Sequence, residues 1–334
     1  MKRLLFSAFC ALPALFTSCV GTGTTGGGGA SAYIGEVGPV YPGITSYIAV
    51  DAYSGHVPLA HAANQRRPVA SLTKIATAIA ALDYLKQSGT DAGEMMTVPP
   101  QVTLLGGPGP AVLQPGDQLS IRDGLYAAMI SSDNYAAETV AAHIGGKLTG
   151  GAGNPMSAFL SRMNAAAARA GLHDTRFANA HGLDLPGQSG YSTAADMARL
   201  TIYALNVPGF TFYSSQPSRR ITINRAGGLL GVSLTTTNEL LFRGGIDGVK
   251  TGTTNLAGQC LIITSPRPST VVKTPDGSTA VTQHRLVVVT LGATERFSQS
   301  WQLFNEGWAA YFRWRAAGSP PAAGQSLSLP VAGL

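Results

Sequence analysis

The sequence predicts an α/β chain of the α+β type, in which an antiparallel sheet is flanked by helices and interrupted by an all-helical lobe. Strand patterns occupy residues 46–62, Ala-rich helical patterns fill residues 75–209, and strand patterns return from Arg219 onward. Strands from both ends of a chain can pair in one sheet when the helices between them pack as another layer. We therefore expect one ordered domain over residues 41–315 that carries the helical lobe as an insertion.

The elements along the chain support this order. The first strand patterns predict a β-hairpin with its tight turn at Tyr53–His56. The segment from Val69 to Leu85 is apolar at helical spacing, and further Ala-rich segments follow between Gly/Pro loops. Later strands are expected in "RRITINR", "IDGVKTGTT", "GQCLIITS" and "HRLVVVTLGA", with an extended hairpin loop over 266–283 and a closing helix over 296–314.

The composition is that of a globular protein with a lightly charged surface. Hydrophobic residues make up 45% of the 334 residues, charged residues make up 12%, and the formal net charge is +6. No block of basic residues is present, which argues against nucleic acid as a partner. Beyond the leader, Cys260 has no second cysteine to pair with and no Cys/His cluster of metal-ligand spacing nearby. We expect Cys260 to be buried and expect no metal or other cofactor.

The start of the chain predicts export. Lys2 and Arg3 precede an apolar run that is too short to span a bilayer, which is typical of a signal peptide, here over residues 1–18. The run ends in "FTSC", so Cys19 resembles the lipidated residue of a bacterial lipoprotein, although Phe16 stands where leucine is usual. The alternative is an ordinary secretory peptide cleaved between residues 18 and 32.

Flexible segments are expected at both ends of the domain. A Gly/Thr/Ser-rich tether over residues 19–40 would let the domain extend from a membrane to which Cys19 is attached. Residues 316–334 are rich in Ala, Gly, Pro and Ser and are expected to be a disordered tail. The protein is therefore expected to be exported and held at the cell envelope, as a monomer.

Ser71 allows two interpretations. A serine directly before an amphipathic helix is a common N-cap. Lys74 follows three residues later, which places both side chains on one face of a helix. A serine hydroxyl becomes a nucleophile when a neighbouring base removes its proton, and a lysine can be that base when its pKa is lowered. The four residues alone favour the cap.

Two further tripeptides have the same ambiguity. Ser132-Asp133-Asn134 lies in a connection between two helical segments, where all three residue types cap helices well. Lys250-Thr251-Gly252 lies at the start of a strand, where a glycine permits close approach of a backbone or ligand. Neither tripeptide by itself indicates an active site.

The three motifs in this order have a specific meaning. S-x-x-K, S-D-N and K-T-G form the set of class A β-lactamases and penicillin-binding proteins. Neighbouring segments such as "RRPVASLTKIATA", "LQPGDQLSIRDGLYAAMISSDNYAAETVA" and "NELLFRGGIDGVKTGTTNLAGQC" are similar to the D-alanyl-D-alanine carboxypeptidase family of low-mass penicillin-binding proteins. The resemblance runs from about Ser46 to Phe312 and implies the serine β-lactamase/penicillin-binding-protein transpeptidase-like fold.

The resemblance implies a role for each motif residue. Ser71 would be acylated by the D-Ala-D-Ala end of a peptidoglycan pentapeptide or by a β-lactam, with Lys74 as its general base. Ser132 would relay a proton to the leaving amine, and Asn134 would orient the substrate amide and Lys74. Lys250 would add positive electrostatic potential around Lys74 and Ser132. The remaining expected substrate-binding residues are Thr251, Gly252, Thr253 and Arg296, and the backbone N–H groups of Ser71 and Thr253 would form the oxyanion hole.

Departures from the family pattern are few. Val69-Ala70 precede the serine where many relatives have Pro-Ala, and Tyr135 follows Asn134 where many have Asp. Many relatives also carry a β-rich domain and an amphipathic anchor after the closing helix, and lipidation at Cys19 would replace that anchor. His181 in "HGLD" is expected to shape its loop rather than to act as a base.

Three alternatives stay open. A class A β-lactamase needs a glutamate between S-D-N and K-T-G to activate water, and the candidates, Glu138 and Glu239, lie outside the "RFANAHGLDLPGQSGYST" loop. A catalytically silent cell-wall binding protein would not need the intact motifs. Carboxypeptidase, endopeptidase and transpeptidase reactions share one acyl-enzyme, and the sequence does not separate them.

Overall fold

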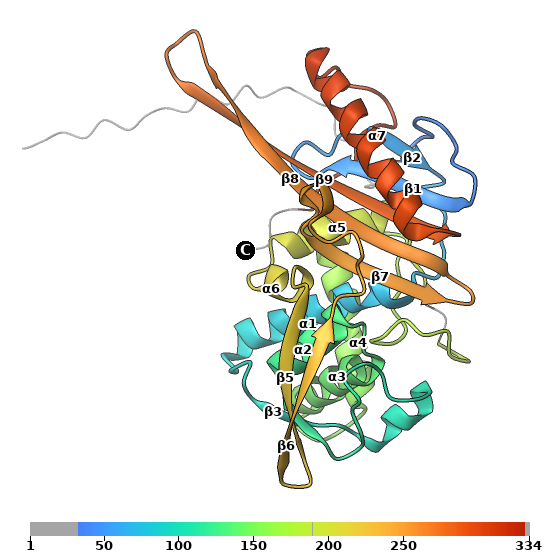
Figure 1. The fold of residues 1–334 in the computed structure, drawn as a ribbon, viewed down its shortest axis with the longest axis vertical. Coiled ribbons are helices and arrows are strands. Elements are labelled where there is room, and N and C mark those ends of the chain that lie inside the picture. Colours follow the sequence, from blue (N-terminus) through green and yellow to red (C-terminus); the bar gives the residue numbers. More distant parts are fainter. Residues whose placement is uncertain (1–32, 189, 331–334) are drawn as a thin grey trace, which may run out of the picture. The chain divides into compact units, whose positions relative to one another are not determined.

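The main sheet joins strands from both ends of the chain, as predicted. The computed structural model describes residues 33–188 and 190–330. Five antiparallel strands have the order β2-β1-β9-β8-β7, which leaves β7 at an edge of the sheet (Figure 1). Their bounds are β1 Ile44–Asp51, β2 Leu59–His61, β7 Gly248–Thr254, β8 Gly258–Lys273 and β9 Thr279–Ala293.

Helices cover both faces of this sheet. Tyr47 and Ala49 of β1 pack with side chains of α7 (Arg296–Ala316), whereas Ile48 and Val50 pack into the larger core on the opposite face. This division follows from the alternation of side chains along a strand. Because both faces are buried, the central strands are nearly continuous apolar runs. Figure 1 shows α7 in red along one side of the sheet.

Along the chain, the helical lobe lies between strands β1 and β2 and strands β7 to β9. Its helices are α1 Lys74–Ser88, α2 Ile121–Ile130, α3 Asn134–Thr149, α4 Pro155–Arg169, α5 Ala194–Leu205 and α6 Phe210–Ser214. Side chains of Ser120, Asp133, Asn154 and Thr193 accept a backbone N–H at the starts of α2 to α5. These caps fix where each helix begins. Within the described ranges, no helix combines the length and hydrophobicity needed to cross a bilayer.

A second, four-stranded sheet was only partly predicted. It has the order β3-β4-β5-β6, with bounds β3 Met95–Thr97, β4 Gln118–Ser120, β5 Ser218–Arg225 and β6 Gly228–Thr235. The sequence indicates β5 but places β3 and β4 within the helical region. Three-residue strands are too short to show an alternating pattern, and most residues of β6 are exposed, so neither signal is visible locally.

The expected hairpin loop over 266–283 continues the sheet strands. β8 and β9 remain paired as far as Lys273, which lies opposite Thr279, and together they form the long orange ribbon in Figure 1. A turn over Thr274–Ser278 closes the ribbon, with the Thr274 N–H donating to the Ser278 carbonyl at 2.9 Å. The loop is therefore extended as predicted, and it is regular β structure.

The ordered domain is larger than residues 41–315. The Gly35 N–H donates to the Gly324 carbonyl at 3.0 Å, and the Leu327 N–H donates to the Gly55 carbonyl at 2.8 Å. Ile34 and Leu327 are 1% and 2% exposed. The expectation of a flexible tether is therefore wrong for residues 33–40, and that of a disordered tail is wrong for residues 316–330. Cys19, the leader and the rest of the tether lie outside the described residues.

Candidate active site

Ser71 lies in a short helical turn directly before α1. This turn, η1, is a 3-10 helix over Ala70–Thr73, and Lys74 is the first residue of α1. The Lys74 Nζ atom donates to the Ser71 Oγ atom at 2.8 Å. Neither η1 nor α1 has a side-chain cap hydrogen bond. The capping interpretation of Ser71 is therefore wrong, because its hydroxyl faces Lys74.

The S-D-N tripeptide combines capping with contact to Lys74. Asp133 is the N-cap of α3, and its carboxylate accepts the backbone N–H groups of Ala136 and Ala111, each at 2.9 Å. Asn134 Oδ1 accepts a hydrogen bond from Lys74 Nζ at 2.7 Å. Ser132 is half-buried and has a φ of 63°. A non-glycine residue in this region is uncommon, and such residues cluster at functional sites.

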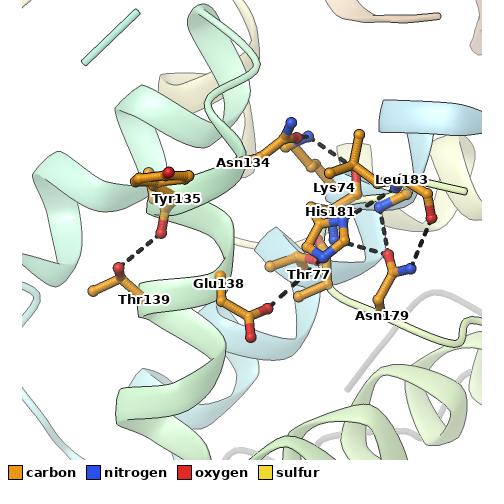
Figure 2. Close-up of polar contacts among 12 residues, drawn as sticks. Lys74, Thr77, Asn134, Tyr135, Glu138, Thr139, Asn179, His181 and Leu183 are labelled. Atoms are coloured by element: carbon orange, nitrogen blue, oxygen red, sulfur yellow. Dashed lines mark hydrogen bonds and ion pairs between the residues drawn. The ribbon is translucent and has the colours of Figure 1, made fainter. Parts of the chain in front are cut away.

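Lys74 is enclosed by protein. Its side chain is fully buried, and its Nζ also donates to the His181 backbone carbonyl at 2.9 Å, so three oxygen atoms surround the nitrogen. Figure 2 shows Lys74 beside Asn134 and His181. Burial lowers the pKa of Lys74 to about 7, although the Asp133 carboxylate acts in the opposite direction. A lysine with this pKa is partly neutral near pH 7 and can accept a proton.

β7 brings the K-T-G residues against η1. Gly252 is buried there, and a Cβ atom at this position would lie 3.0 Å from the Ser71 backbone nitrogen and 3.1 Å from the Val69 carbonyl oxygen. Only a glycine lets the strand approach the serine this closely. The edge of β7 and the Ser71 turn therefore form two sides of one site.

Three basic side chains gather at this site, namely those of Lys74, Lys250 and Arg296. Lys250 is 1% exposed, and its Nζ donates to the Thr251 carbonyl at 3.0 Å. Burial, together with the positive charges of Lys74 and Arg296, holds the pKa of Lys250 well below its usual value. Arg296, the first residue of α7, donates to the Gly252 carbonyl at 3.0 Å and to Thr253 Oγ1 at 2.6 Å. This arrangement can attract a substrate carboxylate.

His181 contacts Lys74 through its backbone only. Its ring Nδ1 accepts the Leu183 N–H at 3.1 Å, and its Nε2 lies 3.9 Å from Glu138 Oε2 on α3 (Figure 2). Burial and the charge of Lys74 lower the pKa of His181 to about 3. Both ring nitrogens face groups other than Ser71. The ring is thus neutral and is not placed to deprotonate the serine.

The comparison with protein families agrees with this geometry. The family profile for D-alanyl-D-alanine carboxypeptidases matches residues 43–274, which include all three motifs. The chain belongs to this family. The resemblance inferred from the sequence is confirmed.

Curated members of the carboxypeptidase family are about one-third identical to this chain. D-alanyl-D-alanine carboxypeptidase DacC of Escherichia coli is 32% identical over 273 residues, which cover 78% of this chain and 60% of the relative. A D-alanyl-D-alanine endopeptidase of Pseudomonas aeruginosa is 32% identical over 206 residues, covering 59% and 58%. The matched part of the chain thus spans about three fifths of the length of these relatives.

Solved structures confirm the predicted fold. The Streptomyces K15 DD-transpeptidase superposes with a TM-score of 0.68 at 25% identity, covering 82% of this chain and 100% of that one. Penicillin-binding protein D2 from Listeria monocytogenes, in its ampicillin-bound form, gives 0.64 at 27% identity, covering 81% and 99%. The chain therefore has the penicillin-binding-protein/DD-transpeptidase fold.

Some contacts in this carboxypeptidase-family site were not predicted. Thr237 Oγ1 lies 2.5 Å from Thr251 Oγ1, and Thr77 Oγ1 donates to the Ala180 carbonyl at 2.6 Å. The Asn179 side chain accepts the Gly182 N–H at 2.6 Å and fixes the turn that carries the His181 carbonyl. Thr237 contacts the K-T-G motif directly, whereas Thr77 and Asn179 bond to residues on either side of His181, whose carbonyl contacts Lys74. Across the described ranges, no group of three or more His, Cys, Asp or Glu side chains is arranged to hold a metal ion.

Proposed function

We propose that the protein is a serine D-alanyl-D-alanine carboxypeptidase that removes the terminal D-alanine from peptidoglycan stem peptides and is acylated by β-lactams. The observation that carries this proposal is the buried Lys74 side-chain nitrogen, 2.8 Å from the Ser71 hydroxyl, with a pKa of about 7. Family membership and the intact motifs support the same reaction.

The proposed first step is acylation of Ser71. Neutral Lys74 takes the proton from Ser71 Oγ, and the oxygen bonds to the carbonyl carbon of the penultimate D-alanine. The backbone N–H groups of Ser71 and Thr253 would stabilise the oxyanion. The C–N bond then breaks, and a proton passes from Lys74 through Ser132 to the leaving amine. The products are an ester on Ser71 and free D-alanine.

The second step is hydrolysis of that ester. Lys74 takes a proton from water, the resulting hydroxide attacks the ester carbonyl, and the Ser71 oxygen recovers a proton as it leaves. During both steps Asn134 would hold Lys74 and the substrate amide. The terminal carboxylate of the intact substrate would be bound by Lys250, Thr251 and Arg296. Gly252 would allow β7 to pair with the backbone of the substrate.

The test is incubation of the full chain with a pentapeptide stem and, separately, with a cross-linked peptide dimer. We expect free D-alanine from the pentapeptide and none with Ser71→Ala. Cleavage of the dimer alone would instead identify an endopeptidase, the activity named for the Pseudomonas aeruginosa relative. Mass spectrometry after penicillin treatment should show an adduct on Ser71, and its absence would favour a silent cell-wall binding protein.

The proposed location is the cell envelope. The basic and apolar leader supports export, and Cys19 followed by a Gly-rich tether supports a lipid anchor. A protein anchored in this way would meet peptidoglycan stems outside the cytoplasm.

A further inference from the structure

Thr237 lies on the segment that crosses from the second sheet to the main sheet. β6 ends at Thr235 and β7 begins at Gly248, so residues 236–247 connect the two sheets. The Thr237 backbone N–H donates to the carbonyl of Ile130, the last residue of α2, at 3.1 Å. Ile130 precedes Ser132 by two residues. The segment is therefore attached to the wall of the site that carries the S-D-N motif.

The same residue also contacts the K-T-G motif. Thr237 Oγ1 lies 2.5 Å from Thr251 Oγ1, which is within hydrogen-bonding distance for two hydroxyl groups. The side chain of the next residue, Asn238, donates to the Gly248 carbonyl at 3.2 Å and holds the segment along the start of β7. Thr237 thus hydrogen-bonds to both walls of the Ser71 site, through its backbone to one and through its side chain to the other.

Thr251 is held in place by the sheet. Its backbone pairs with Leu261 of β8, and its carbonyl accepts a hydrogen bond from Lys250 Nζ at 3.0 Å. The residue is buried, and a β-branched side chain has a stiff χ1 angle, so the position of Thr251 Oγ1 is fixed. The hydroxyl proton can still rotate about the C–O bond. What the surroundings of Thr251 must still determine is the direction of this proton.

The contact between the two threonine hydroxyls has two possible directions. A hydroxyl group has one proton to donate and two lone pairs that accept. If Thr237 donates to Thr251 Oγ1, the Thr251 proton is free to be donated to a ligand. If Thr251 donates to Thr237, its oxygen presents lone pairs to that ligand instead. An ionised carboxylate only accepts hydrogen bonds, so it is bound by the first arrangement and repelled by the second.

We propose that Thr237 is a positioning residue for the terminal carboxylate of the substrate: its hydroxyl donates to Thr251 Oγ1, so that the Thr251 hydroxyl donates to the carboxylate. Because the Thr237 backbone is anchored at Ile130, its hydroxyl is in place before the substrate binds. A donor that is oriented in advance need not be reorganised on binding. This inference rests on the proposed peptidase function, in which Thr251 binds that carboxylate, and adds the residue that orients Thr251.

The test compares a pentapeptide that ends in a free carboxylate with the same peptide as its C-terminal amide. Thr237→Val removes the hydroxyl but keeps the shape of the side chain and the backbone N–H that reaches Ile130. We expect KM for the acid to rise about tenfold while kcat stays within about twofold, because a hydrogen bond to a charged group is lost equally in the ground state and the transition state. For the amide, kcat/KM should stay within about twofold of wild type. Thr237→Ser retains a hydroxyl and should keep KM for the acid near the wild-type value.

Two further variants separate the positioning role from a general effect on the fold. Thr251→Val already removes the donor to the carboxylate, so adding Thr237→Val to it should raise KM for the acid no further, whereas independent effects would multiply. Thr235→Val removes an exposed hydroxyl at the end of β6, two residues away, and should keep the wild-type KM.

The outcomes distinguish this inference from the proposed function. Equal losses for the acid and the amide in Thr237→Val, or an unchanged KM for the acid, would overturn the positioning role, while release of D-alanine by the wild-type protein would still support the peptidase. Multiplying effects in the double variant would also overturn it. No release of D-alanine from the acid by the wild-type protein would overturn both.

Discussion

The Nζ atom of Lys74 and the Oγ atom of Ser71 lie 2.8 Å apart, although the serine belongs to η1 and the lysine begins α1. The same nitrogen also contacts Asn134 Oδ1 and the His181 carbonyl, from two other segments of the helical lobe. The lysine is thus held at the serine by groups that are distant in sequence. Its burial is what makes it a base.

Replacing Lys74 tests its role directly. Lys74→Ala removes the base, so we expect the rate of penicillin acylation of Ser71 to fall about 10²- to 10⁴-fold. The measurement is the time course of the covalent adduct by mass spectrometry. The thermal unfolding transition should remain cooperative in the variant. Acylation at the wild-type rate would show that another group deprotonates Ser71.

The rate of acylation should depend on pH through Lys74. Because the pKa of Lys74 is lowered to about 7, the neutral base is depleted below pH 7, and the rate should fall roughly tenfold per pH unit there. Above pH 7 the rate should level off. A profile that stays flat from pH 5 to 8 would contradict the assignment.

Lys74 should also make stability pH-dependent. Its pKa is about 7 in the folded protein and 10.5 for an ordinary lysine, so the unfolded state binds more protons between these values. Burial of Lys74 therefore lowers the free energy of unfolding most below pH 7, and this cost diminishes as pH rises toward 10.5. Urea titrations at several pH values should show a smaller pH dependence in Lys74→Met than in wild type.

Gly252 should be sensitive to a single methyl group. In Gly252→Ala the new Cβ would approach the Ser71 nitrogen to 3.0 Å and the Val69 carbonyl oxygen to 3.1 Å, so β7 and η1 must separate. We expect acylation by penicillin to slow by at least about tenfold, since small displacements at a reacting centre are costly. Gly277→Ala, at the ribbon turn, is a control for the general cost of replacing a glycine, here one with positive φ.

We expect Arg296 to contribute to the binding of substrates that carry a terminal carboxylate. Loss of a charged hydrogen-bond donor predicts a rise in KM of roughly ten- to a hundredfold in Arg296→Gln for a pentapeptide acid. The corresponding C-terminal amide should show a much smaller change. Equal losses for the acid and the amide would indicate that Arg296 only positions Gly252 and Thr253, which it also contacts.

Cys19 should determine membrane attachment. If it carries the lipid, Cys19→Ser should move the protein from the membrane fraction to the soluble fraction of cells. Cys260→Ser, which changes a buried cysteine of the domain, is the matched control. An unchanged membrane fraction in Cys19→Ser would rule out the lipid anchor.

Long elements were predicted well from the sequence and short ones poorly. β1, β8 and β9 contain apolar runs long enough to be recognised, and the helices after Thr73 follow from their spacing. β3 and β4 have three residues each, so no periodicity marks them. The contacts of Ile34 and Leu327 join the two ends of the domain, and no local pattern encodes such a pairing.

The order of the elements, the three motifs and the family follow from the sequence alone, because they depend on local patterns and on residue identity. The folded structure was needed to show that Ser71 faces Lys74 rather than capping a helix, and that Glu138 reaches the His181 loop. Burial and the meeting of distant segments set the pKa of Lys74. Such effects depend on the surroundings of a side chain, which spacing along the chain does not specify.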